Sequence, residues 1–161
     1  MLLYYLNIYH DLYIMSKTSM ENPESTILSR KVKVGMYIVI EERPCKVTQV
    51  LVSKTGKHGY SKVYISGVDI FTQVKRTLVM VSWHVVQIAN VIQYNVSLID
   101  IDEHGICILF SDYAGIKDNL KIPDNELGNQ IKQLFDSGQQ VEVCIMSCLN
   151  IEMIMSYKIF T

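Results

Sequence analysis

VLVSKTGKHGYSKVYISGVDIF, residues 50–71, contains two strand-like runs on either side of a short polar loop. In the second run, 60–71, the residues Val63, Ile65 and Gly67 share one face, because side chains of a β-strand alternate between two faces. The stretch therefore predicts a β-hairpin with the loop at its tip, in a fold made of short antiparallel strands.

The remainder of the first half has the same period of two. MYIVIEERPCKVTQVLVS, 36–53, predicts strand, turn and strand, with the bend at Glu42-Arg43-Pro44, because proline cannot donate to a strand ladder. RTLVMV (76–81) and VVQIANVI (85–92) are two more short runs. About five short strands with tight connections indicate a small barrel.

The second half predicts more strands and one helix. VSLIDIDEHGICILF, 96–110, is a hairpin candidate that turns at 102–105, and 140–149 and 151–159 are two further strands. PDNELGNQIKQLFDSG, 123–138, is the one convincing helix. We expect Asp124 or Asn125 to cap it, Gly138 to end it, and one apolar stripe to face the core, made of Leu127, Ile131, Leu134 and Phe135. Five strands with one inserted helix are the outline of an OB-fold.

Charge divides the chain into the same two halves. We expect a disordered N-terminal extension at 1–26, a basic domain at 27–87 and an acidic domain at 88–161. The basic part has ten Lys/Arg against three Asp/Glu, and the acidic part has four Lys against ten Asp/Glu. Such asymmetry suggests that the first domain contacts nucleic acid, although two solvated surfaces of opposite sign would look the same.

The sequence lacks the patterns of a membrane span, a signal peptide, a zinc site and a disulfide framework, and this bears on the cellular compartment. The apolar run at 1–14 is interrupted by Asn7, His10 and Asp11, so it is too short to span a membrane and is a poor signal peptide. The four cysteines form no CxxC pair, which disfavours a zinc site or a disulfide framework. We expect a cytoplasmic protein with no membrane partner, no bound metal and no separate cofactor.

The loop at 53–63 does not fit a catalytic motif. A phosphate-binding loop would need glycine at Leu51 and Ser or Thr at His58, and no cysteine pattern supports Cys/His catalysis. What remains is an exposed lysine, Lys57, between Gly56 and Gly59, which allow a tight turn and leave room for an approaching partner. A lysine ammonium attracts phosphates, but a merely solvated basic tip would have the same composition.

The motif of this loop resembles one family. SKTGKHG (53–59), followed by YSKVY and GVDIFT, is similar to the signature of translation initiation factor 5A, the eukaryotic and archaeal relative of bacterial elongation factor P. The likeness extends to RPCKV (43–47) and LKIPDNELGNQI (120–131), and so covers roughly residues 27–145.

The resemblance implies a mostly β fold, an SH3-like barrel followed by an OB-fold with one helix, and a non-catalytic function. It implies that Lys57 receives an aminobutyl group from spermidine and is hydroxylated to hypusine, by deoxyhypusine synthase and a hydroxylase. The modified side chain would reach the acceptor end of peptidyl-tRNA on the ribosome and assist peptide-bond formation at slow sequences and termination. Five neighbours would present it or contact the tRNA, namely Lys54, Thr55, Gly56, His58 and Gly59. The resemblance leaves a homodimer possible.

Some residues depart from the family pattern. The segment 73–92 is more apolar and lacks the family's prolines, although His84 falls where the family has a histidine. Tyr60 stands where a second histidine is common. Two alternatives follow: a structural paralogue of the same fold without a ribosomal function, and a general single-strand RNA binder that uses the OB face. The acidic second half, with few aromatics, counts against the latter.

Overall fold

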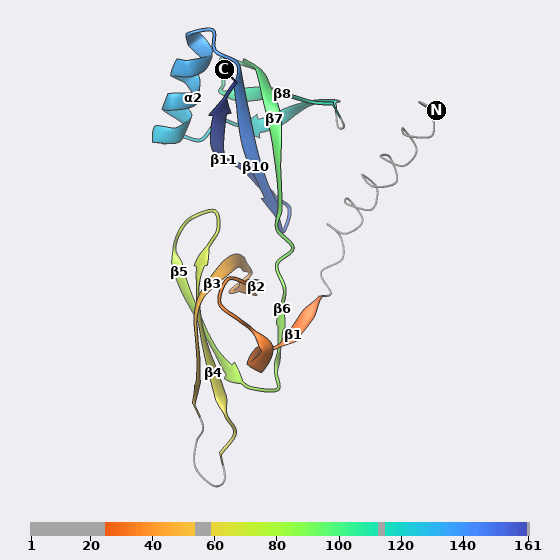
Figure 1. Ribbon diagram of the computed structural model, residues 1–161, viewed down its shortest axis with the longest axis vertical. Coiled ribbons are helices and arrows are strands. Elements are labelled where there is room, and N and C mark those ends of the chain that lie inside the picture. Colours follow the sequence, from red (N-terminus) through yellow and green to blue (C-terminus); the bar gives the residue numbers. More distant parts are fainter. Residues whose placement is uncertain (1–24, 54–58, 113–114, 161) are drawn as a thin grey trace, which may run out of the picture. The chain divides into compact units, whose positions relative to one another are not determined.

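The computed structural model describes residues 25–53, 59–112 and 115–160. The chain divides into two compact units between Asn90 and Val91. Both are built mostly from antiparallel strands, as the sequence predicts (Figure 1). Of the expected extension at 1–26, only the last two residues are described, and Thr26 already belongs to a strand.

Unit 1 is a curled sheet of the SH3-like type. Its four-stranded sheet has the order β2-β3-β4-β5. The strands are β2 (Tyr37–Ile40), β3 (Arg43–Ser53), β4 (Lys62–Asp69) and β5 (Lys75–Val81). A separate pair, β1 (Thr26–Leu28) with β6 (Val85–Gln87), lies beside the 3-10 turn η1 (Ser29–Lys31), and a single bridge from Ile38 to Ile88 connects β2 to the residue after β6.

The core of unit 1 confirms the alternation predicted for β4. Val63 and Ile65 are fully or almost fully buried together with Ile38, Ile40 and Val47, whereas Lys62 and Tyr64 are exposed. The predicted bend at Glu42-Arg43-Pro44 is wrong by about one residue, because Ile40 pairs with Arg43 and the turn is Glu41-Glu42. Both turn residues have positive φ, 51° and 60°, as a two-residue hairpin whose twist matches its strands requires.

Unit 2 is the expected five-stranded OB-fold. Its sheet has the order β11-β10-β7-β8-β9. The strands are β7 (Ile92–Ile101), β8 (Ile106–Ser111), β9 (Gly115–Lys121), β10 (Val141–Cys148) and β11 (Ile151–Ile159). The turn 102–105 is confirmed: Gly105 has φ of 79°, and the Asp102 carboxylate accepts hydrogen bonds from the backbone N–H groups of His104 and Ile106.

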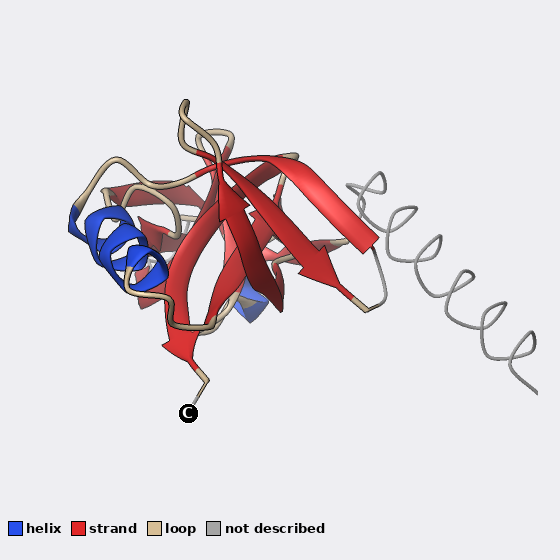
Figure 2. Cartoon of the chain, turned by 90° about the horizontal axis from the view of Figure 1, so that it is seen from above, coloured by secondary structure: helices blue, strands red, loops and turns tan. Residues whose placement is uncertain are grey.

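Helix α2 (Glu126–Asp136) lies against these strands, and Figure 2 shows it beside the curved sheet. Asn125 is the cap, because its side chain accepts a hydrogen bond from Gly128 N at 3.3 Å. Gly128 permits a close approach, since a Cβ atom there would lie 1.8 Å from the Pro123 carbonyl oxygen. Gly138, with φ of 78°, ends the helix in a Schellman motif, and Ile131 is the fully buried member of the predicted stripe.

A polar cluster connects the two edge strands of the unit 2 sheet. Lys117 on β9 lies 2.5 Å from the Glu152 carboxylate on β11, and Tyr94 on β7 donates to the same carboxylate at 3.0 Å. Burial alone would lower the pKa of Lys117, but its bonds to Glu152 and Tyr94 raise that pKa. Because the two outer strands are otherwise paired on one side only, the cluster helps to close the barrel.

Replacing Glu152 with glutamine should therefore destabilise unit 2. We expect a loss of about 1–2 kcal/mol in the free energy of unfolding, because Lys117 and Tyr94 lose a charged acceptor in a partly buried place. Amide hydrogen exchange in β9 and β11 measures it. The matched control is Glu103→Gln, which changes an exposed carboxylate in a turn. Equal exchange in the two variants would contradict a structural role of the cluster.

Candidate nucleic-acid interface

The lysine loop leaves unit 1 at the end of its longest hairpin. Ser53 and Lys62 are the paired residues at the loop end of β3 and β4, and residues 54–61 connect them (Figure 1). Lys57 and four of its predicted neighbours, Lys54, Thr55, Gly56 and His58, therefore lie outside the described residues. Gly59, the fifth, is described and is exposed. The assignment of these six residues stays a prediction.

The stem of the loop is held by the turn between β5 and β6. Ser61 and Ser82 are joined by a hydroxyl–hydroxyl hydrogen bond of 2.8 Å, and Ser82 N donates to the Ser61 carbonyl at 3.0 Å. Ser29 of η1 holds this turn in place, because its N donates to His84 O at 2.8 Å and its hydroxyl donates to Val81 O at 3.0 Å. The position where β4 begins is thus fixed from three segments of the chain.

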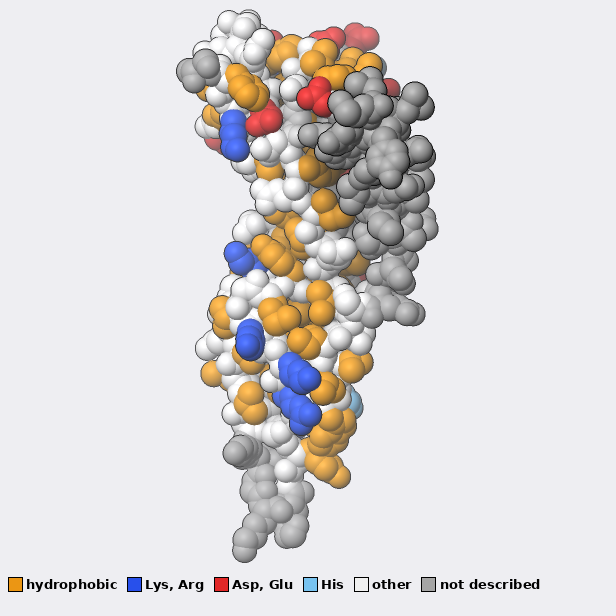
Figure 3. All heavy atoms as spheres, turned by 45° about the vertical axis from the view of Figure 1, so that its right-hand side comes forward, with side chains coloured by type: hydrophobic (Ala, Val, Ile, Leu, Met, Phe, Trp, Pro, Cys, Tyr) orange, Lys and Arg blue, Asp and Glu red, His pale blue; other side chains and the backbone are white. Residues whose placement is uncertain are grey.

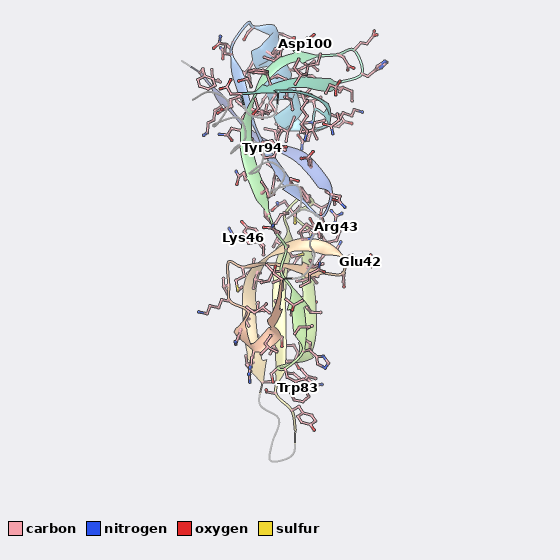
Figure 4. All side chains as sticks on the ribbon, turned by 90° about the vertical axis from the view of Figure 1, so that its right-hand side faces the viewer. Glu42, Arg43, Lys46, Trp83, Tyr94 and Asp100 are labelled. Atoms are coloured by element: carbon pink, nitrogen blue, oxygen red, sulfur yellow. The ribbon has the colours of Figure 1, made fainter. Side chains whose placement is uncertain are left out.

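Two aromatic side chains lie on this stem. The Tyr60 and Trp83 rings meet edge to face, with centroids 4.3 Å apart and an interplanar angle of 86°. Both remain open to solvent, at 70% and 46% exposure. Tyr60 directly precedes the braced Ser61, and Trp83 lies inside the bracing turn, at one end of unit 1 (Figure 4).

Charge is unevenly distributed along unit 1. The acids described in this unit, Glu41, Glu42 and Asp69, belong to the end of the sheet away from the loop, where β3 begins and β4 ends. Figure 4 shows Trp83 at one end and Glu42 at the other. The loop end carries exposed cations, Arg30 and Lys31 on η1 and Lys62 on β4. Figure 3 shows Lys and Arg side chains among apolar ones on this unit.

Two of the basic residues counted in the sequence serve the fold. Arg43 Nε lies 2.8 Å from the Asp69 carboxylate, and Arg76 lies 2.5 Å from Glu41 with its Nε 3.9 Å from Asp69. Asp69 is fully buried and also accepts from the N–H groups of Phe71 and Thr72. Burial alone would raise the pKa of Asp69, but Arg43 and these N–H groups hold it at about 2. Arg43 and Arg76 are thus tied to this network.

The described residues offer little for metal or thiol chemistry. They contain no group of three or more His, Cys, Asp or Glu side chains that could hold a metal ion. All four cysteines are buried, and burial raises the pKa of Cys107 to about 11. Within the described part of the chain, no helix is long and apolar enough to cross a membrane.

Sequence reasoning missed the Tyr60–Trp83 pair and the role of Asp69. Asp69 continues the buried face of Val63, Ile65 and Gly67. Because a carboxylate on a buried face needs a partner, the alternation in β4 could have predicted an ion pair at Asp69. The aromatic pair had no signal in the spacing, because its two rings are separated by the whole of β4 and β5.

Comparison with known protein families matches each unit separately. Residues 25–84 match the family described as "Translation initiation factor 5A-like, N-terminal". Residues 90–158 match "Eukaryotic elongation factor 5A hypusine, DNA-binding OB fold". These matches define a two-domain translation factor.

Similar proteins agree with that class. Eukaryotic translation initiation factor 5A-1 of Arabidopsis thaliana is 43% identical over 123 residues, which cover 76% of this chain and 78% of the relative. The factor from Spodoptera exigua is 34% identical over 122 residues, 76% of each chain. A solved family protein from Naegleria fowleri superimposes with a TM-score of 0.78 at 35% identity, covering 83% of this chain and 97% of the other. The chain belongs to the translation initiation factor 5A family.

Proposed function

We propose that this protein is a hypusine-bearing translation factor that acts on the ribosome and is not itself an enzyme. The observation that carries the proposal is the charge at the loop end of unit 1. The charged residues described there are all cations, and the TGKHG sequence, 55–59, lies in the loop that extends from this end. RNA phosphates attract such a surface. The described residues contain no group of three or more His, Cys, Asp or Glu side chains that could hold a metal ion beside it.

Lys57 is the residue we assign to the modification. Deoxyhypusine synthase would join the aminobutyl group of spermidine to the Lys57 side-chain nitrogen, and the hydroxylase would complete the residue. The added chain gives reach and a second amine, so the side chain can approach the acceptor end of peptidyl-tRNA while the basic surface contacts rRNA and tRNA phosphates. There it would assist peptide-bond formation at stalled sequences such as proline runs, and termination, in the cytoplasm.

Mass spectrometry of the peptide across Lys57 tests the assignment. In protein isolated from its native cells, we expect Lys57 to carry the aminobutyl group and its hydroxyl, and Lys62, on the other side of the loop, to be unmodified. Protein from the same cells grown without spermidine is the control. An unmodified Lys57 in native protein would instead favour the alternative, a structural paralogue of the same fold that has no ribosomal function.

A further inference from the structure

The Tyr60–Trp83 pair lies at an exposed end of unit 1. The two rings do not belong to the buried hydrophobic cluster of this unit, which consists of aliphatic residues and Cys45. An edge-to-face contact covers one ring face only. Tyr60 is 70% exposed and Trp83 is 46% exposed, so part of each aromatic side chain is accessible to solvent.

The backbone beside the pair is held by hydrogen bonds. Tyr60 is followed by Ser61, which is hydrogen-bonded to Ser82, and Trp83 lies between Ser82 and His84, which are both hydrogen-bonded to η1. A preorganised aromatic surface loses little conformational entropy when a flat ligand stacks on it. The Trp83 and His84 rings are also near each other, with centroids 6.2 Å apart.

The charged residues at the same end of unit 1 indicate the class of ligand. Arg30 is joined to the Trp83 turn through its N–H to Ser82 O, Lys31 follows it, and Lys62 lies two residues after Tyr60. The acids described in unit 1 lie at the other end of β3, whose 11 residues span roughly 30 Å. Aromatic rings beside cations are the composition of sites that bind single-stranded nucleic acid, where bases stack and phosphates pair with Lys and Arg.

We propose that Tyr60 and Trp83 form a stacking platform for an unpaired nucleobase of RNA, next to the loop that carries Lys57. The inference rests on the proposed function and deepens it, because it adds a base contact to a surface otherwise described by phosphate contacts. Stacking tolerates any base, since every base has a π-face, so the platform recognises an unpaired end rather than a sequence.

The test uses the full chain with an unmodified Lys57, so that its result does not depend on hypusine. Because Trp83 is the only tryptophan, its fluorescence reports on the platform alone. We expect a single-stranded RNA ending in CCA to quench it at saturation. A blunt duplex of the same length should bind through phosphates with little quenching. Equal quenching by both RNAs would overturn the proposal.

Variants test the same point through affinity, measured by anisotropy of labelled single-stranded RNA. Tyr60→Leu and Trp83→Leu should each weaken binding about 5- to 100-fold, as expected for the loss of one base stack. Trp83→Phe, which keeps an aromatic ring, should retain most of the affinity. The matched control is Tyr64→Leu, which removes an exposed tyrosine on the outer face of β4 and should leave affinity unchanged.

Unchanged affinity in both leucine variants, with unfolding temperatures like that of the unmutated chain, would overturn the platform. A slower modification of Lys57 in those variants, with unchanged RNA affinity, would also overturn the platform. It would indicate that the aromatic pair contacts the modifying enzyme instead of RNA. Neither result would affect the mass of Lys57 in native protein, so failure of the platform and failure of the proposed function are distinguishable.

Discussion

Cells in which Lys57 is replaced by arginine should lose the function of this protein while keeping its charge and its fold. Arginine stays cationic but presents a guanidinium in place of the amine to which the aminobutyl group is joined. Synthesis through a run of prolines, measured with a reporter, should therefore fall to the level of cells lacking the protein, and growth should slow with it.

The control for this replacement is Lys121→Arg, the same chemical change at an exposed lysine on β9. It should leave growth and reporter synthesis unchanged. Normal growth and normal synthesis through proline runs in the Lys57→Arg cells would contradict the proposed function, because the extended side chain would then be dispensable.

Local periodicity was sufficient to predict most elements of this fold. The alternation in 60–71 predicted β4 and its buried face, and the i, i+4, i+7 spacing predicted α2 with its cap and its terminal glycine. The strand β9 (Gly115–Lys121) was missed, because GIKDNLK has only one buried position, Leu120, and its pairing with β8 supplies the missing stability. Its edge position is recognisable only from the sheet order.

The site was less predictable than the fold, because its members come from distant segments. Ser29 and Val81 are 52 residues apart, and Arg43 and Asp69 are 26 apart. From composition alone, Arg43 and Arg76 were included among the cations expected to contact nucleic acid. In the structure they form ion pairs at the end of unit 1 that contains Asp69. Residues 54–58 lie outside the described residues, so the sequence motif remains the basis for assigning the modification to Lys57.

The Asp69→Asn variant should be strongly destabilised. Asparagine has the same shape, but it leaves Arg43 and Arg76 without their shared anion at a fully buried position. Removal of one partner from a buried charge pair costs about 3 kcal/mol or more. The Trp83 fluorescence in a urea titration measures it, since the only tryptophan lies in the same unit as Asp69. Glu42→Gln, an exposed carboxylate in that unit, should cost nothing measurable.

The pH dependence of this loss in stability separates the contribution of the Asp69 charge from that of its side-chain packing. The folded pKa of about 2 lies below the ordinary value of 3.8. The carboxylate therefore stabilises unit 1 above about pH 4, by about 2 kcal/mol, and this contribution is lost as the pH falls through 2. The difference in unfolding free energy between the unmutated chain and Asp69→Asn should be full at pH 6 and should shrink steadily below pH 4. A difference that stays constant down to pH 2 would show that packing of the side chain, and not its ion pair with Arg43, holds this end of the sheet together.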